Sequence, residues 1–218
     1  MVWFMPMSKS ILITRPDHDL ITKYFCAWSN ELVDFAKSKM IKVYDLKGKK
    51  SNKKKFLSYI NIRCPSLIFL NGHGNADIFA GYGDEPMVGV ETILKDAIVY
   101  ARSCEVGKNL GLILVQNGAH SFIGYNRKFF CGYTPEKITK PLEDEIAGLF
   151  LKPSNLIIST LLKSNSVQEA HNRSRKSMYK NFRKMVSSTS TFEERYSARW
   201  LWSNLHSQVI FGDPLKTI

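Results

Sequence analysis

The chain has 218 residues, 44% of them hydrophobic, and 31 lysines and arginines against 19 acidic residues give it a net charge of +12. This length and apolar content suit one well-filled core, so we expect a single domain over residues 1–218. No apolar run approaches the roughly 18 residues of a membrane span, and the cysteines lack metal-site or disulfide-framework spacing, so we expect no membrane contact and no structural metal.

Residues 1–7 are apolar, but they lack a basic leader and a small-residue cleavage site, and Lys9 follows at once. We therefore expect no secretion signal. Together with the scattered cysteines, this predicts a cytoplasmic protein whose thiols stay reduced.

The first half of the chain alternates apolar, β-rich runs with helical patterns. Asp17 or Asp19 can cap a helix that carries apolar residues at helical spacing as far as Phe35. A lysine-rich segment, residues 47–55, looks like an exposed loop, and a crossover at residues 56–60 follows it. We predict strands at residues 11–14, 41–44 and 67–70. Strands that alternate with helices indicate a parallel sheet with right-handed crossovers.

The alternation of strand and helix continues as far as Pro135, after which the sequence pattern is helical. Glycines in residues 76–90 mark a loop or small hairpin. Residues 97–100 and 119–124 predict two further strands, with a helix at residues 108–116 between them. Beyond Pro135 we predict helices at residues 142–151, 155–162, 167–186 and 192–205, interrupted by Pro153 and by residues 187–190. This helical part is expected to cover the sheet without forming a second domain.

Two segments carry much of the positive charge, residues 47–55 and residues 173–184. The second fits a helix with basic residues on one side and an inward stripe of Ala170, Ser174, Met178, Phe182 and Met185. We favour a solvated surface for both segments, because charge runs more often solubilise than bind. A site for nucleic acid or another polyanion is the alternative.

A histidine and a cysteine each lie where a predicted strand gives way to a loop. His73 follows the strand at residues 67–70, and Cys104 follows the strand at residues 97–100. In an open parallel sheet, the loops at the carboxyl ends of neighbouring strands form a crevice. A cysteine that acts as a nucleophile needs at least an imidazole beside its thiol, and both groups are expected in that crevice.

The surroundings of these two residues differ from those of the other histidines and cysteines. Gly72 and Gly74 allow backbone to approach a ligand closely beside His73. The predicted helix after Cys104 favours a thiolate through its amino end. Structural or surface roles are expected for the others, which are Cys26, Cys64, Cys131, His18, His120, His171 and His206.

In this order, the motifs resemble those of the caspase-like cysteine peptidases, the group that includes caspases, legumain, gingipains and the bacterial CHAT domains. The shared features are His-Gly at residues 73–74, Cys-Glu-x-Gly at residues 104–107, the segments 118–124 and 166–170, and Gly-Asp-Pro at residues 212–214. The resemblance covers most of the chain. It implies a three-layer α/β sandwich, in which a mostly parallel central sheet has helices on both faces and a helical C-terminal part.

Carried over residue by residue, the resemblance implies that Cys104 is the nucleophile and that His73 protonates the departing amine. It also implies an oxyanion hole made by the amides of Gly74 and Cys104, where one donor contributes roughly 3 kcal/mol in other enzymes. No third member of a triad, no metal and no cofactor is implied.

Arg102 is the departure from the family pattern that concerns the substrate. Because side chains at i and i−2 of a strand share a face, we expect Arg102 to point into the same crevice as Cys104 and to bind a substrate carboxylate. Arg15, just past the first strand, is expected to converge on the same pocket. In one alternative Arg102 pairs internally with an acid, and in another the acids line a pocket for arginine or lysine. These acids are Asp17, Asp77, Asp84 and Glu105.

The sequence therefore predicts a cytoplasmic cysteine endopeptidase that cleaves a protein or peptide substrate with a dyad of His73 and Cys104. Its control is expected to come from a regulatory protein partner, a ligand or self-cleavage, with residues 47–55 as the candidate site for nicking. One alternative is a non-catalytic scaffold or polyanion-binding protein on the same fold. Another is cysteine-dependent acyl transfer, or hydrolysis of a non-peptide substrate.

Overall fold

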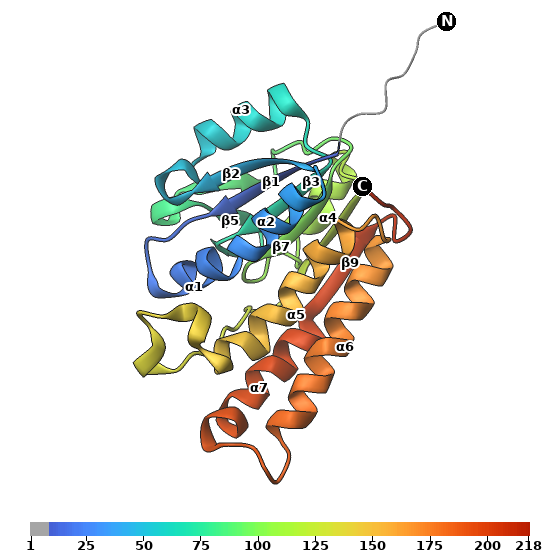
Figure 1. Ribbon diagram of the computed structural model, residues 1–218. Coiled ribbons are helices and arrows are strands. Elements are labelled where there is room, and N and C mark those ends of the chain that lie inside the picture. Colours follow the sequence, from blue (N-terminus) through green and yellow to red (C-terminus); the bar gives the residue numbers. More distant parts are fainter. Residues whose placement is uncertain (1–8) are drawn as a thin grey trace, which may run out of the picture.

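The centre of the computed structural model, which describes residues 9–218, is a six-stranded sheet (Figure 1). Its strands are β1 (Ser10–Arg15), β2 (Lys42–Lys47), β3 (Leu67–Asn71), β7 (Ile98–Arg102), β8 (Ser121–Tyr125) and β9 (Gln208–Gly212). In space they lie in the order β2-β1-β3-β7-β8-β9, and every neighbouring pair is parallel except β8 and β9. The mostly parallel sheet is therefore confirmed, whereas the prediction on residues 1–7 lies outside the described residues.

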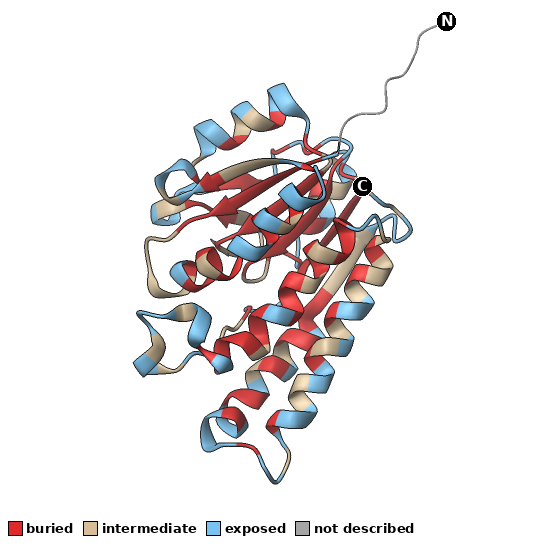
Figure 2. Cartoon of the chain, in the orientation of Figure 1, coloured by how far each residue is buried: buried red, intermediate tan, exposed pale blue. Residues whose placement is uncertain are grey.

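Helices cover both faces of this sheet. One face carries α1 (Leu20–Trp28), α2 (Asn30–Ser38), α5 (Glu145–Leu161), α6 (Val167–Met185) and α7 (Phe192–Ser207), and the other carries α3 (Lys53–Arg63) and α4 (Leu110–Gln116). Successive side chains of a strand point to opposite faces, so the sheet has a hydrophobic core on each side. Phe69 packs in the core beneath α1 and α5, and Leu70 packs in the core beneath α3 and α4. Figure 2 shows the strands buried between these layers, which confirms the three-layer α/β fold.

A second, smaller sheet holds the histidine of interest. It consists of β4 (His73–Gly74), β5 (Ile78–Ala80) and β6 (Pro86–Gly89), which are antiparallel. This sheet confirms the hairpin expected in residues 76–90. Short 3-10 helices complete the described elements, at Gly48–Lys50, Tyr82–Asp84, Pro135–Lys137 and Pro141–Glu143. No helix in residues 9–218 combines the length and apolar character needed to cross a bilayer.

The single helix expected after the first strand is in fact two helices. Asp19 caps α1, because its Oδ1 accepts a hydrogen bond from the backbone N–H of Thr22 at 2.8 Å. The break between α1 and α2 is at Ser29, whose hydroxyl donates to the carbonyl of Phe25 at 2.6 Å. Such a local bond competes with helix continuation. The same hydroxyl accepts a hydrogen bond from Arg102 at 2.8 Å, so the break serves a buried network.

The break expected at Pro153 is wrong, because α5 continues through it. A proline in a helix leaves the carbonyl four residues earlier without its hydrogen bond. Here that carbonyl belongs to Leu149, and Nδ2 of Asn181 in α6 donates to it at 2.8 Å. Packing between two helices thus supplies the bond that the local sequence removes.

The lysines of residues 47–55 are exposed as expected, but the segment is not a loop. Lys47 ends β2, a 3-10 turn follows, and Asn52 caps α3 by accepting a hydrogen bond from the N–H of Lys55 at 3.0 Å. Ser51, in the middle of the segment, is buried. Because nicking favours mobile loop tips, this anchored segment is a poor candidate for self-cleavage.

The basic helix α6 follows its predicted pattern, except that Phe182 is only half-buried. Arg173 pairs with Glu169 at 2.6 Å, and Lys184 pairs with Glu194 of α7 at 3.0 Å. These pairs neutralise part of the basic face. The strand β9 was not predicted; it begins directly where α7 ends and pairs with β8 through the register Phe122–Phe211.

Candidate active site

The register of two central strands brings His73 and Cys104 to one place. Parallel pairing of β3 with β7 sets Asn71 opposite Arg102, and the N–H of Gly72 donates to the Arg102 carbonyl at 3.4 Å. His73 and Cys104 each follow two residues after this last pair. Both line one cavity of about 230 Å³. The expected crevice at the strand ends therefore exists and contains both side chains.

The glycine beside the histidine permits this close approach. A Cβ atom on Gly74 would lie 2.5 Å from the hydroxyl of Ser103 and 2.8 Å from the carbonyl of Ile78. Both distances are far below van der Waals contact, so only glycine fits. The segment that carries His73 can thus lie directly against the segment that leads into Cys104.

Within residues 9–218, two backbone amides beside His73 and Cys104 are free to donate, although Gly74 is not among the residues that line this cavity. The N–H of Asn75 donates to the carbonyl of Ile78 at 2.9 Å, which makes these residues a hydrogen-bonded pair. Because such pairs alternate in an antiparallel ladder, the neighbouring Gly74 directs its N–H away from β5. The Cys104 amide makes no backbone hydrogen bond within residues 9–218, whereas the amide of Glu105 donates to the Arg127 carbonyl at 3.0 Å.

The thiol of Cys104 rests in its protonated form. Burial raises its pKa above the ordinary value, and the nearby Glu105 carboxylate acts in the same direction. The expected activation by a helix amino end is absent, because α4 begins only at Leu110. The thiol donates weakly to the Phe129 carbonyl, with Sγ and O 3.8 Å apart. To act as a nucleophile, this thiol would need a base to remove its proton.

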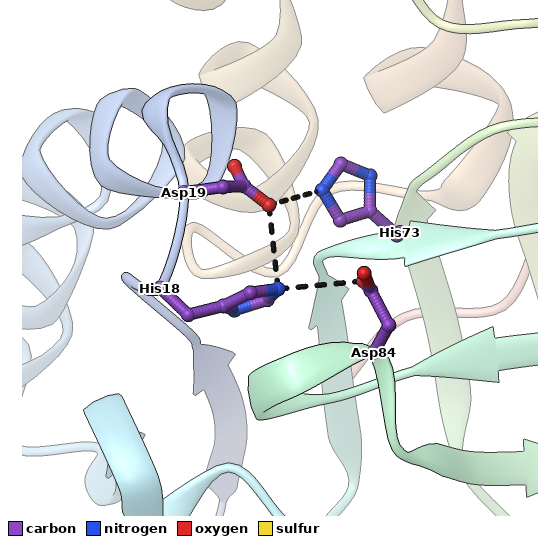
Figure 3. Close-up of side chains that lie close together, drawn as sticks. All are labelled: His18, Asp19, His73 and Asp84. Carbon is purple, nitrogen blue, oxygen red and sulfur yellow. Dashed lines mark hydrogen bonds and ion pairs between the residues drawn. The ribbon is translucent and has the colours of Figure 1, made fainter.

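His73 has a carboxylate partner that the sequence did not reveal. Its Nε2 lies 2.6 Å from Oδ2 of Asp19, and both side chains are 36% exposed (Figure 3). Partial burial opposes ionisation of Asp19, but hydrogen bonds from the Thr22 backbone and from His73 hold its pKa below the usual value. The carboxylate is therefore ionised and accepts from Nε2–H, which leaves Nδ1 of His73 for proton transfer.

The signal that could have found Asp19 is its position. It follows β1, whose carboxyl end opens on the same crevice, and it is one of the two caps proposed for the helix. Two further residues join it. Nε2 of His18 lies 3.3 Å from Oδ2 of Asp19 and 3.3 Å from Oδ1 of Asp84. Suitable ligand atoms of His18, Asp19, His73 and Asp84 all lie within 4.8 Å of one another, so these four side chains could hold a cation.

Arg102 does not face the cavity, contrary to expectation. Its side chain is fully buried on the side of α1 and α5, with its guanidinium 4.9 Å from the ring of Phe25 and 5.1 Å from the ring of Phe69. None of its hydrogen-bond partners is an acid. They are the side chains of Asn71, Ser29, Ser154 and Asn155 and the Phe25 carbonyl.

Arg15 is also turned inward rather than toward the cavity. It is 4% exposed, and its Nε donates to Oδ1 of Asp45 at 2.9 Å. Further bonds join it to Asn30 and to the carbonyl of Cys26. The hydrogen bond and charge of Asp45 raise the pKa of Arg15 despite the opposing effect of burial. Both arginines thus stabilise the fold and have no exposed guanidinium for a substrate.

The wall of the cavity is mostly apolar. It is formed by Ile21 and Phe25 of α1 and by residues 129–131, together with Gly72 and Ser103. Cys131 acts there as a small apolar group, because burial raises its pKa to about 12. A larger cavity of about 400 Å³ between α2 and α5 is lined by neither histidine nor cysteine. His73 also lines a third cavity, of about 360 Å³, together with Gly74 and Asp84, whereas the cavity of about 230 Å³ is lined by both His73 and Cys104.

No protein-family model matches the chain, and no curated protein matches it in sequence. Among solved structures, it is similar to the Arg-specific cysteine proteinase gingipain R (RgpB), with a TM-score of 0.62 and 11% identity over 97% of this chain and 48% of that chain. It is also similar to the complex of the pro- and mature domains of RgpB from Porphyromonas gingivalis (TM-score 0.58, 11% identity, 95% and 48% covered). A third similar structure is described as a protease (TM-score 0.60, 12% identity, 97% and 48% covered). The chain has a gingipain-like, caspase-like fold and spans about half the length of these chains.

Proposed function

We propose that this protein is a cysteine peptidase, with Cys104 as the nucleophile, His73 as the proton-transfer group and Asp19 as its positioning residue. One observation carries the proposal: His73, bonded to Asp19, lines the same cavity as Cys104 at the ends of adjacent parallel strands. The fold of cysteine proteinases supports it. A thiol, a partly exposed imidazole and an ionised carboxylate in this order match the logic of a catalytic triad.

The reaction follows from the protonation states. Nδ1 of His73 accepts the Cys104 proton as Sγ attacks the substrate carbonyl, and the imidazolium that forms is stabilised by the Asp19 carboxylate. The amides of Gly74 and Cys104 donate to the oxyanion of the tetrahedral intermediate. His73 then protonates the departing amine, which leaves a thioester. Water, deprotonated by His73, hydrolyses the thioester and returns the thiol.

Replacement of Asp19 by serine separates its role as the cap of α1 from its role as the hydrogen-bond partner of His73. Serine also caps helices, so α1 should persist and thermal stability should change little, whereas the bond to His73 Nε2 is lost. We expect kcat/KM to fall by about 10² to 10⁴-fold, as when other enzymes lose the carboxylate that orients a catalytic histidine. Steady-state kinetics and thermal unfolding of Asp19→Ser test this. A fall in thermal stability large enough to account for the lost activity would contradict a positioning role.

The apolar cavity supports a neutral, apolar residue before the scissile bond. The acidic preference expected from Arg102 is not supported, and among residues 9–218 no acidic side chain lines the cavity to hold arginine. A charged side chain would lose its hydration there without gaining a partner. We therefore expect leucine, methionine or phenylalanine substrates to exceed aspartate and arginine substrates by at least about 30-fold in kcat/KM.

A peptide library, with Cys104→Ala protein as the blank, tests both the activity and this preference. Ile21→Glu should shift the preference toward arginine, since Ile21 lines the cavity from α1. Lys23→Glu, on the exposed side of the same helix, is the matched control and should leave the profile unchanged. A wild-type preference for aspartate or arginine would contradict the assigned cavity. Absence of cleavage, together with absence of Cys104 labelling by peptidyl electrophiles, would favour the scaffold or polyanion-binding alternative.

The target is proposed to be a protein in the cytoplasm, where the four free cysteines would stay reduced. Control by a protein partner or segment is supported by the neighbouring RgpB structure, which is a complex of pro- and mature domains. Intact mass spectrometry of wild-type and Cys104→Ala protein under activating conditions detects self-cleavage, which would produce fragments only in the wild type.

A further inference from the structure

We propose that His18, Asp19, His73 and Asp84 form a binding site for Zn²⁺, and that the bound ion inhibits the enzyme by occupying Nε2 of His73. The site itself stands on the geometry of these four side chains. The inhibition rests on the proposed peptidase function.

Two of the spacings between donor atoms match a tetrahedral ion, and all four donor atoms lie within 4.8 Å of one another. Zinc bonds to nitrogen and oxygen at about 2.0–2.2 Å, which gives a tetrahedron with edges of about 3.3–3.5 Å. Nε2 of His18 lies 3.3 Å from the nearest oxygens of both Asp19 and Asp84. The edge between His73 and Asp19 is 2.6 Å, the length of the hydrogen bond that the ion would replace. Figure 3 shows the four side chains converging on a common centre.

Contacts outside the cluster orient two of the ligands, Asp19 and His18. Oδ1 of Asp19 accepts from the backbone N–H of Thr22 at 2.8 Å, which leaves Oδ2 directed at both imidazoles. The ring of His18 packs on Tyr82, with 5.2 Å between ring centroids, and its buried Nδ1 has no hydrogen-bond partner within residues 9–218. Nε2 is therefore the nitrogen that His18 offers. Asp19 thus has the outer hydrogen bond that is typical of metal ligands, whereas His18 is oriented by its packing on Tyr82.

Charge and ligand type select the ion. Two carboxylates and two neutral imidazoles carry a charge of −2, which a divalent cation balances within a chain of net charge +12. Calcium and magnesium prefer all-oxygen sites, whereas two imidazoles and two carboxylates suit zinc. The same cluster has no thiolate that would favour copper(I).

Inhibition follows from the tautomer of His73. A metal on Nε2 requires the proton of neutral imidazole to be on Nδ1. Nδ1 is the atom that must accept the thiol proton of Cys104, so the metal-bound ring cannot act as the base. Zinc would also displace the hydrogen bond by which Asp19 orients the ring.

Metal binding is measured first, without reference to activity. Calorimetry with Zn²⁺ and visible absorption with Co²⁺ are applied to wild-type protein, His18→Ala and Asp84→Asn. His120→Ala is the matched control, because His120 pairs with Asp96 at 3.8 Å outside the cluster. We expect one ion per chain and a tetrahedral Co²⁺ spectrum. Binding should weaken at least about 30-fold in His18→Ala and Asp84→Asn, since even outer contacts of metal sites contribute about 10- to 100-fold.

Inhibition is measured second, with EDTA reversal. His18→Ala and Asp84→Asn keep Cys104, His73 and Asp19, so they should cleave peptide while resisting zinc at concentrations that inhibit the wild type and His120→Ala. Lack of Zn²⁺ binding by the wild type, or equal binding and inhibition in the variants, would overturn the site. Metal binding by a wild-type protein that cleaves no peptide would retain the site and reject the peptidase function.

Discussion

Replacement of Cys104 by alanine is expected to lower peptide hydrolysis by at least about 10⁴-fold, because loss of the nucleophile removes the covalent route altogether. The fold should persist, since the change deletes one sulfur atom whose only hydrogen bond is weak, with Sγ 3.8 Å from the Phe129 carbonyl. Initial rates with the best library substrate, together with far-UV circular dichroism, measure the two effects. His73→Ala should lose activity to a similar degree with its fold retained.

The control for this change is Cys64→Ala, which removes an exposed thiol at the end of α3, outside the cavity. It should keep full activity, and it should still be labelled once by a peptidyl electrophile. Activity that survives in Cys104→Ala, or that is lost equally in Cys64→Ala, would reject Cys104 as the nucleophile.

Replacement of Arg102 by methionine is expected to reduce the free energy of unfolding by about 3–5 kcal/mol, a loss in the range of broken buried polar networks. The guanidinium is completely buried, and the substitution leaves the side-chain oxygens of Asn71 and Asn155 without their donor. Burial lowers the pKa of Arg102, yet a guanidinium stays charged at neutral pH. Urea unfolding at neutral pH measures the change.

Arg63→Met is the matched control, because Arg63 is exposed in the last turn of α3, and its free energy of unfolding should change by less than about 0.5 kcal/mol. Arg102→Lys retains the positive charge but not the several N–H donors of the guanidinium. Its free energy of unfolding should therefore fall by an amount between those of the other two variants. Wild-type stability in Arg102→Met, with selective loss of acidic substrates, would restore the specificity role that the strand pattern predicted.

The buried position of Arg102 connects stability to the active site. Its hydrogen bonds link β3, the turn between α1 and α2, and α5, while its own strand leads into Cys104. The arginine thus fixes the strand end that leads into Cys104, the proposed nucleophile. We therefore regard it as a structural support of the site rather than a contact of the substrate.

Several features could be predicted from the sequence because they depend on local pattern. Strands in a buried parallel sheet are apolar on both faces, so runs such as residues 67–70 are visible without tertiary information. His73 and Cys104 stand out because each follows such a run, and carboxyl ends of parallel strands meet at one edge. The position of Asp19 as a helix cap is likewise a local property.

Other features depended on contacts between distant segments. The helix α5 passes through Pro153 because Asn181, in another helix, bonds the freed carbonyl. The strand β9 exists because it pairs with β8, although its own residues continue directly from a helix. Local propensity does not report a partner that lies far along the chain.

The site shows the same division between pattern and packing. Side chains two residues apart share a face only within a continuous strand. Because β7 ends at Arg102, the chain turns before Cys104, and the two side chains point in different directions. The sequence by itself determined the five parallel strands of the central sheet and the placement of His73 and Cys104 after two of them, because hydrophobic periodicity and strand ends are local. Only the tertiary structure decided that Asp19 partners His73 and that both arginines point inward, because hydrogen-bond partners are chosen by three-dimensional proximity.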